Sequence, residues 1–335
     1  MTQTDIILEV KDLCVEFRTA EGTVQAVDHL SYVLHKGEKL GIVGESGSGK
    51  SVSSLGMMQL IPNPPGQITG GEILYLGRDL VKTSERDMQK IRGNEISMIF
   101  QEPMTSLNPI IKCGKQIAES LRLHRGMKKK EAMEEAIRMM RAVGIANPEV
   151  RAHEYPHQMS GGMRQRVMIA MALACQPQIL IADEPTTALD VTIQAQVLET
   201  MKELREKFGS AMIMITHDLG IIAEVCDEVS VVYAGQIVEH GTLEDVFEHT
   251  LHPYTEGLFG SLPNIEERRH RLQPIPGLMP DPTDLPKGCC FAPRCKYCTE
   301  ECKKARPEIK WTSDTHYVRC SRYDEPGFKI ERSVQ

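Results

Sequence analysis

Short apolar runs bounded by polar residues recur along the chain and predict buried β-strands. They cover residues 40–43, 96–100, 179–182 and 212–215. The last two runs are apolar throughout, which is typical of parallel strands covered on both faces of a sheet. Residues 6–10 and 13–17 also have strand-like composition, and the turn-like pair Glu21-Gly22 follows them. We therefore expect an antiparallel edge sheet followed by an α/β sheet domain.

A helical period replaces the strand pattern between residues 110 and about 144. Its apolar positions are three and four residues apart, as at Ala132, Ala136 and Met140. This spacing predicts helices with one buried face. Residues 191–208 predict a further long amphipathic helix between two of the buried strands.

The chain is expected to fold as more than one unit, because 335 residues exceed the usual size of a single hydrophobic core. The α/β domain is assigned to residues 1–250, with a helical subdomain inserted at about 105–175. Seven prolines fall within 34 residues after His249, which predicts a linker or an extended wrap over 251–287. Residues 288–335 are then expected to form a separate small module.

Composition excludes several classes of protein. An apolar content of 41% and a charged content of 25% are those of an ordinary globular protein. No apolar run approaches the roughly 20 residues that span a bilayer, and the first five residues lack the features of a signal peptide. We expect a soluble protein that stays in the cytoplasm unless a partner holds it at a membrane. The net charge of −7 argues against nucleic acid as a partner.

A phosphate-binding motif follows the first buried run. It reads Gly44-Glu45-Ser46-Gly47-Ser48-Gly49-Lys50-Ser51, which matches G-x-x-x-x-G-K-S without a departure. Its glycines let successive backbone N–H groups point at phosphate oxygens, and the helix expected at 51–60 presents its positive end to the same anion. Lys50 adds a positive charge and the Ser51 hydroxyl a ligand for Mg²⁺. The motif alone predicts only that a nucleoside triphosphate binds.

Two acidic residues end the run at 179–182. In open α/β sheets ligands bind at the carboxyl ends of the strands, where Asp183 and Glu184 are placed. Asp183 is expected to hold Mg²⁺, directly or through water. Glu184 is expected to accept a proton from the water that attacks the γ-phosphate, or to orient that water.

Polar residues also end two other strands and begin a helix. Gln101 ends the strand at 96–100, and Thr216-His217-Asp218 ends the strand at 212–215. The stretch Ser160-Gly161-Gly162-Met163-Arg164-Gln165 opens a helix, so that its amides and the Ser160 hydroxyl are expected to form a second anion site.

In this order the motifs resemble those of the ATP-binding subunits of ABC transporters, over roughly residues 5–250. The resemblance rests on the phosphate loop, Gln101, the Ser160-Gly161-Gly162 signature, Asp183-Glu184, Ala188-Leu189-Asp190 and His217. It implies a P-loop NTPase fold, ATP hydrolysis and a head-to-tail dimer. Each ATP would lie between the phosphate loop of one subunit and the signature of the other.

The resemblance also implies individual roles by position. Gln101 would link the Mg²⁺ and the attacking water to the membrane subunit, and His217 would sense the γ-phosphate. Asp190 would contact the partner across the dimer, and Phe17 would stack on adenine. Met163 departs from the Gln of most signatures, which suggests a partner chain of different sequence.

Further stretches resemble one branch of the family, the D-type ATPase subunit of dipeptide and oligopeptide importers. They are residues 101–109, Met163, His252-Pro253-Tyr254-Thr255 and Ile275-Pro276-Gly277. This resemblance implies a heterodimer with a second ATPase subunit, two membrane permease subunits and an extracytoplasmic binding protein. The chain would lie peripherally at the cytoplasmic face of the membrane, and the isolated chain could instead form a homodimer.

Six of the ten cysteines fall between residues 289 and 320. By register with the peptide importers, the four shared positions are Cys289, Cys295, Cys302 and Cys320, with Cys290 and Cys298 as extras. Four thiolates on a segment without a core of its own suggest a metal that holds it together. Their spacing is wider than that of usual zinc pairs, and the resemblance includes members with a [4Fe–4S] cluster. That cluster is favoured, with Zn²⁺ or plain thiols as alternatives, and His316 is expected at the surface rather than as a ligand.

The sequence thus predicts an ATPase that uses ATP and Mg²⁺ to power the import of di- or oligopeptides. One alternative is the same role in an importer of nickel or another small solute. A second is a soluble ABC ATPase that acts on DNA or ribosomes. A third is a redox-regulated binding module in which the cysteine segment matters more than ATP turnover.

Overall fold

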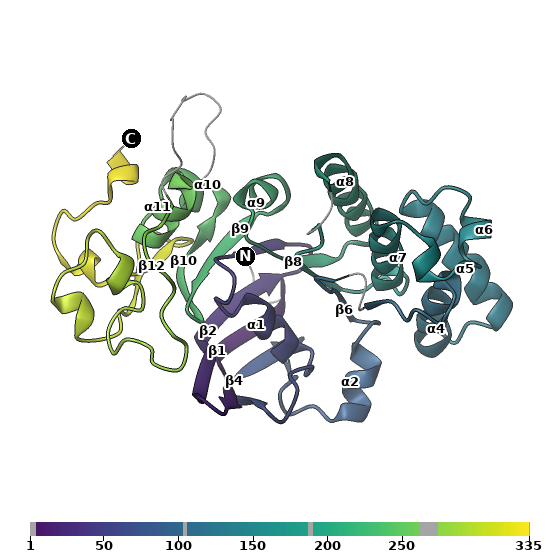
Figure 1. Cartoon of the computed structure of the whole chain (residues 1–335), viewed down its shortest axis with the longest axis horizontal. Helices are drawn as coiled ribbons and strands as arrows, with labels where there is room; N and C mark the ends of the chain where they lie inside the picture. Colours follow the sequence, from purple (N-terminus) through teal and green to yellow (C-terminus); the bar gives the residue numbers. More distant parts are fainter. Residues whose placement is uncertain (1–4, 103–105, 187–189, 262–273, 335) are drawn as a thin grey trace. The chain divides into compact units, whose positions relative to one another are not determined.

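The computed structural model describes residues 5–102, 106–186, 190–261 and 274–334 (Figure 1). The chain divides into two compact units that are each discontinuous in sequence. Unit 1 comprises Met1–Ile7, Leu34–Lys39 and Lys82–Ile215, and unit 2 comprises Leu8–Val33, Leu40–Val81 and Thr216–Gln335. Across the described ranges, no helix is both long and apolar enough to cross a membrane.

Three parallel strands form the centre of unit 1. They are β6 (Ile96–Ile99), β7 (Ile179–Asp183) and β8 (Ala211–Thr216), in the order β8-β7-β6. Every residue of the three strands is buried, as the continuous apolar runs of β7 and β8 predict. Phe100 lies beyond the end of β6 and is 38% exposed, so the first of these strands is one residue shorter than the run.

Unit 1 also contains helices in its described residues. They are α2 (Glu85–Ile91), α4 (Cys113–Arg125), α5 (Lys129–Ala142), α6 (Pro148–Arg151), α7 (Gly161–Leu173) and α8 (Val191–Phe208), with the 3₁₀ turn η2 (Pro156–Gln158). The helical pattern at 110–144 contains two helices because Gly126 ends α4 in the left-handed conformation. The apolar faces of α4 and α5 pack against each other and against α7, and these three helices lie together in Figure 1.

An antiparallel sheet near the start of the chain belongs mostly to unit 2. Its order is β2-β1-β4-β5, formed by β1 (Ile6–Thr19), β2 (Gly22–His35), β4 (Gly66–Tyr75) and β5 (Arg78–Asp79). The two strands expected at 6–10 and 13–17 are one strand. The register with β4 shifts between Lys11 and Cys14, and Asp12 has a φ of +53°. This bulge absorbs the polar residues that interrupt the strand pattern.

The second sheet of unit 2 has the order β11-β12-β10-β9-β3. Its strands are β3 (Lys39–Val43), β9 (Glu228–Tyr233), β10 (Gln236–Thr242), β11 (Ile309–Trp311) and β12 (Tyr317–Arg319). Only the pairing of β3 with β9 is parallel within this part of the sheet. The helices of unit 2 are α1 (Lys50–Met57), α9 (Leu219–Val225), α10 (Leu243–Glu248) and α11 (Pro253–Gly260), and its 3₁₀ turns are η3 (Ala292–Arg294), η4 (Glu301–Lys303), η5 (Ser321–Asp324) and η6 (Glu331–Val334).

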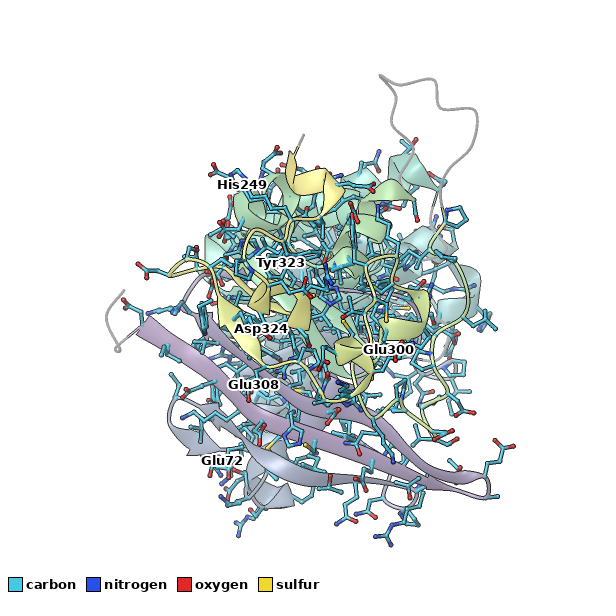
Figure 2. The ribbon with its side chains drawn as sticks, turned by 90° about the vertical axis from the view of Figure 1, so that its left-hand side faces the viewer. Glu72, His249, Glu300, Glu308, Tyr323 and Asp324 are labelled. Carbon is cyan, nitrogen blue, oxygen red and sulfur yellow. The ribbon has the colours of Figure 1, made fainter. Side chains whose placement is uncertain are left out.

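The C-terminal segment is joined to this sheet rather than folded on its own. Strand β12 pairs with β10 through Glu239–Val318 and His240–Tyr317, and Val318 is fully buried. The Tyr323 hydroxyl, labelled in Figure 2, donates to the carbonyl oxygen of Leu251 at 2.8 Å. A segment that is too small for a core of its own thus shares an existing one.

The stretch after His249 also holds more structure than its prolines suggest. Helix α11 begins there with Pro253 in its first turn, where proline is tolerated because that amide has no partner within the helix. Tyr254 on this helix is fully buried. The domain boundaries expected from the sequence remain a prediction.

A buried carboxylate ties these parts together. Glu239 on β10 is fully buried, and its oxygens accept the backbone N–H groups of Leu251 at 2.7 Å and His252 at 2.9 Å. The His316 ring nitrogen Nε2 lies 3.0 Å from the same carboxylate. The expectation that His316 is a surface residue was therefore wrong, because Glu239 gives its imidazole a partner inside the protein.

We expect Glu239→Ala to lower the free energy of unfolding by about 3 kcal/mol, because two backbone donors and an imidazole lose their buried acceptor. Urea denaturation followed by circular dichroism measures this loss. Glu308→Ala removes an exposed carboxylate from the C-terminal segment and serves as the matched control. Equal losses in the two variants would contradict the role given to Glu239.

Candidate functional site

The phosphate-binding motif forms the turn between β3 and α1, as predicted. Gly49 precedes α1 with a φ of +97°, and a Cβ at this position would lie 2.2 Å from the carbonyl oxygen of Ala26. A Cβ at Gly44 would lie 2.2 Å from the carbonyl oxygen of Val232. The backbone passes so close to its neighbours that only glycine fits at these two positions.

The lysine of the motif lies inside the loop. The Lys50 ammonium donates to the carbonyl oxygens of Gly44 at 2.7 Å and Glu45 at 2.8 Å, and the residue is only 5% exposed. The loop is anchored at Ser48, whose carbonyl oxygen accepts the Gly235 N–H at 2.9 Å.

Other residues of the loop face outward. Ser46 and Gly47 are exposed, and Ser51 is half-buried in the first turn of α1. This turn carries no acidic side chain. The arrangement suits an anion, because a positive side chain, a helix N-terminus and glycine backbone N–H groups are all close to one loop.

A second set of predicted residues meets in unit 1. Strands β6 and β7 are parallel neighbours, so Gln101 and Glu184 follow them at the same edge of the sheet. The Gln101 amide donates to the Glu184 carboxylate at 3.0 Å. Asp183, the last residue of β7, directly precedes Glu184 in the chain and is buried. Two carboxylates and an amide provide oxygen ligands of the kind that Mg²⁺ binds, directly or through its water molecules.

The backbone of Glu184 is unusual. Its φ is +46°, in the left-handed region that residues with a side chain rarely adopt, and its N–H donates to the carbonyl oxygen of Ile215 at 2.8 Å. Such strained residues cluster at functional sites, where the surrounding structure fixes the direction of the side chain. The direction of the Glu184 carboxylate is thus set by its backbone and by its contact with Gln101.

The signature residues form the exposed start of α7. Ser160 caps this helix by accepting the Met163 N–H at 3.3 Å. Ser160 and Gly161 are exposed, and a Cβ at Gly161 would meet no atom within 4 Å. The side chain of Gln165 fixes the helix from the other side by donating to the carbonyl oxygen of Pro185.

The remaining predicted residues occupy separate places. Asp190 is exposed and caps α8 by accepting the Ile193 N–H at 2.9 Å, whereas Ala188 and Leu189 lie outside the described residues, as do residues 103–105. His217 is exposed just before α9. Phe17 is half-buried on β1 opposite Gly66, where an added Cβ would lie 2.7 Å from the ring.

The predicted site residues therefore divide between the two units. The phosphate loop, Phe17 and His217 belong to unit 2, and Gln101, Asp183, Glu184, the signature and Asp190 belong to unit 1. Within its own unit, the structure brings Gln101 and Glu184 into contact and folds the phosphate loop around Lys50. A common site formed by both sets stays a prediction.

Comparisons with known proteins identify the family. Residues 27–187 match the model of the ABC transporter family, and residues 238–302 match that of the oligopeptide/dipeptide transporter C-terminal region. The oligopeptide transport ATP-binding protein OppD of Bacillus subtilis is 54% identical over 99% of this chain and 93% of its own length. The chain belongs to the ATP-binding proteins of oligopeptide and dipeptide ABC transporters.

Other similarities agree with this assignment. The dipeptide transport ATP-binding protein DppD of Bacillus subtilis is 50% identical over 95% of both chains. The solved structure of the ATP-binding cassette MJ0796, a dimer in a post-hydrolysis state with ADP and Pi, aligns with a TM-score of 0.64. It is 26% identical and covers 70% of this chain and 98% of its own. The protein is thus an ABC ATPase.

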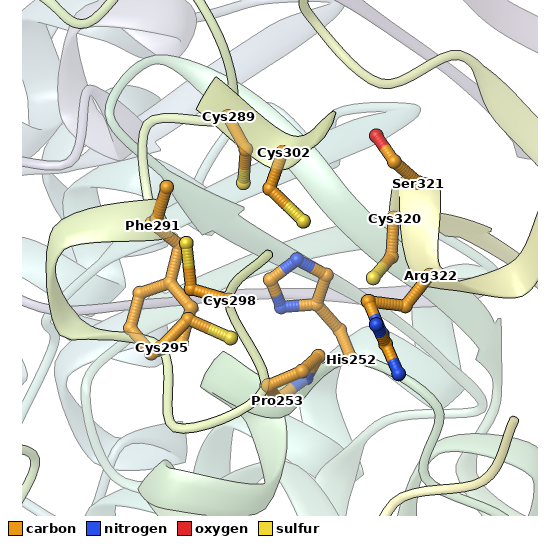
Figure 3. Close-up of a pocket in the computed structure, with 11 residues that line it drawn as sticks. His252, Pro253, Cys289, Phe291, Cys295, Cys298, Cys302, Cys320, Ser321 and Arg322 are labelled. Atoms are coloured by element: carbon orange, nitrogen blue, oxygen red, sulfur yellow. The ribbon is translucent and has the colours of Figure 1, made fainter. Parts of the chain in front are cut away.

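A cavity rich in cysteine lies in the C-terminal part of this ABC ATPase (Figure 3). Its lining includes the four predicted cysteines, Cys289, Cys295, Cys302 and Cys320. The extra Cys298 also lines it, together with His252, Phe291 and other residues. The side chains of Cys289, Cys302 and Cys320 point into the same space in Figure 3. Cys290 does not line the cavity, and its sulfur accepts a hydrogen bond from Arg306.

Burial raises the pKa of three of the cavity thiols. Desolvation raises the pKa of Cys289 to about 11 and that of Cys295 and Cys320 to about 12. None of the ten cysteines, all of which are described, forms a disulfide. In the parts of the chain that are described, no group of three or more His, Cys, Asp or Glu residues could hold a metal ion as arranged.

Two contacts with the phosphate loop were not predicted from the sequence. Arg294 donates to both carboxylate oxygens of Glu45, at 2.6 and 3.0 Å, and the Tyr254 hydroxyl accepts the Glu45 N–H at 2.8 Å. Tyr254 belongs to a stretch that the family resemblance had marked. Nothing in the sequence signals the Arg294 contact, because 249 residues separate the two partners.

We expect Gly49→Ala to weaken ATP binding at least about tenfold, because its Cβ would collide with the Ala26 carbonyl and distort the loop. Titration with a fluorescent ATP analogue measures the affinity. Gly77→Ala is the matched control, since Gly77 also has a positive φ of +80° but no atom within 4 Å of an added Cβ. Unchanged affinity in Gly49→Ala would contradict the steric requirement.

Proposed function

We propose that this ABC ATPase hydrolyses ATP to power the import of di- or oligopeptides through a membrane transporter. The contact of Gln101 with the Glu184 carboxylate carries the catalytic part, because it places a base and a polar ligand at one sheet edge. The relatives named as oligopeptide and dipeptide transport proteins carry the substrate. They favour peptides over nickel or another small solute.

In the proposed reaction the loop from Gly44 to Ser51 holds the phosphates through its backbone N–H groups and Lys50. Ser51, Gln101 and Asp183 would hold Mg²⁺, which supplies charge neutralisation at the phosphates when bound. Glu184 takes a proton from the attacking water or orients it.

The other predicted residues complete the proposed ATP site. His217 contacts the γ-phosphate and Phe17 stacks on adenine. Ser160, Gly161 and Gly162 close over the ATP of a head-to-tail partner, and Asp190 contacts that partner. The exposure of Ser160, Gly161 and Asp190 supports this role, as does the dimeric state of the cassette MJ0796.

We propose a second ATPase subunit as that partner, with a homodimer as the alternative for the isolated chain. Met163 supports a heterodimer, since a different chain would then carry the Gln form of the signature. Two permease subunits and an extracytoplasmic binding protein would complete the importer. They would hold this chain peripherally at the cytoplasmic face of the membrane.

Glu184→Gln tests the proposed chemistry. The change keeps the size and the hydrogen-bonding shape of the side chain but removes the base. We expect turnover by the reconstituted importer to fall at least about a hundredfold while ATP affinity changes less than about threefold. Phosphate release measures ATP turnover, and uptake of a labelled peptide measures transport.

Glu199→Gln is the control, because it removes an exposed carboxylate from α8 in the same unit. Undiminished uptake in Glu184→Gln would overturn the role of Glu184. Full ATP turnover without any peptide uptake by the complete importer would overturn the peptide assignment.

We also propose that Cys289, Cys295, Cys302 and Cys320 hold a [4Fe–4S] cluster. Their common position around one cavity supports this. The spacing of these cysteines along the chain is wider than that of usual zinc pairs, which favours the cluster over the zinc alternative.

We expect anaerobically purified protein to contain iron and acid-labile sulfide and to be coloured. Cys289→Ser should lose most of both, because it removes a ligand from the cavity. Cys290→Ser should retain them, because the neighbouring Cys290 points elsewhere. Colourless protein without sulfide, or equal retention in the two variants, would contradict the cluster.

A further inference from the structure

Arg294 connects the cysteine segment, the C-terminal residues 288–335, to the phosphate loop within unit 2. It lies on the turn η3, one residue before Cys295, and is only 8% exposed. Its two terminal nitrogens each donate to one Glu45 carboxylate oxygen, at 2.6 and 3.0 Å. Its Nε donates to the carbonyl oxygen of Pro276 at 2.9 Å. Two-point contacts of this kind fix both the position and the direction of the carboxylate.

The ring cluster around Arg294 holds the same loop through its backbone. The guanidinium carbon lies 5.8 Å from the centroid of the Tyr233 ring. The rings of Tyr233, Tyr254 and Phe291 pack against one another, with centroids 4.6 to 5.5 Å apart. The Tyr254 hydroxyl accepts the Glu45 N–H at 2.8 Å. Both the side chain and the backbone of Glu45 are therefore held by residues that come much later in the chain, Arg294 and Tyr254.

The charge of Glu45 gives this contact a consequence for binding. Glu45 is the only acidic residue between Gly44 and Ser51, and the ligand of the loop is a triphosphate of like charge. An unpaired carboxylate in the loop would repel that ligand. Arg294 cancels this charge, and the pKa of its guanidinium is raised, chiefly because it donates hydrogen bonds to the Glu45 carboxylate.

We propose that Arg294 is a positioning residue for ATP binding, which fixes and neutralises Glu45 so that the affinity of the phosphate loop depends on the cysteine segment. The inference goes beyond the proposed function. It rests on ATP binding alone and requires neither the peptide substrate nor the iron–sulfur cluster.

The test measures ATP affinity by titration with a fluorescent ATP analogue. We expect Arg294→Gln to bind ATP about tenfold more weakly, since a charge-assisted contact is lost and Glu45 is left unpaired. The rate at saturating ATP should change less than about twofold, because Arg294 does not contact the reacting groups. Lys303→Gln, which breaks an exposed ion pair with Glu300 in the same segment, should bind ATP like the unchanged protein.

A second substitution separates positioning from general support of the fold. Glu45→Gln removes the charge but keeps the shape of the side chain, so it should bind ATP at least as tightly as the unchanged protein. Arg294→Gln combined with Glu45→Gln should recover most of the lost affinity. A double variant as weak as Arg294→Gln, weakened binding in Glu45→Gln, or normal binding in Arg294→Gln would each overturn the proposal.

These outcomes are independent of the other assignments. Cys289→Ser protein that lacks iron but contains Arg294 and Glu45 provides a second background for the same titrations. Failure of the cluster proposal would leave the Arg294 effect intact there, and failure of peptide uptake would not alter ATP affinity. If Arg294→Gln does not fold, Glu45→Gln alone still decides between a charge effect and a purely structural role.

Discussion

A loop that binds phosphate through its backbone must keep its N–H groups uncovered and in fixed directions. Here the constraint is met by close approach, since Gly44 and Gly49 lie so near the carbonyls of Val232 and Ala26 that no side chain fits between them. The loop therefore takes its shape from the strands around it. The Gly235 N–H adds a hydrogen bond to the carbonyl of Ser48. Displacement of any of these neighbours would displace the anion site as well.

The C-terminal segment depends on the same sheet for its own stability. It has few residues with which to form a core, so β12 joins β10 and the fully buried Glu239 accepts donors from two other stretches of chain. A buried carboxylate is tolerated only where several donors replace its lost hydration. Because those donors come from the segment and from the start of α11, this arrangement couples the order of both to the sheet.

Local patterns were sufficient to predict the buried strands and the individual motifs. The parallel strands were predictable because each is a short, largely apolar run, and Gln101 and Glu184 were predicted to follow two of them. The structure adds that these two residues contact each other. Long-range polar contacts were not predictable, since the partners Arg294 and Glu45 are 249 residues apart and no local pattern links them. His316 was misjudged for the same reason, because a single histidine carries no sign of a buried acceptor.

The loop motif treats four positions as free, yet Glu45 at the first of them is not free here. Lys50 brings one positive charge into the loop and Glu45 would cancel it, which leaves little attraction for a triphosphate beyond that of the backbone. The bidentate contact with Arg294 restores a net positive charge near the loop and keeps the Glu45 carboxylate in a fixed position. A glutamate at this position therefore makes sense only together with the buried arginine. The cysteine segment supplies that arginine and is, in this respect, part of the machinery that binds ATP.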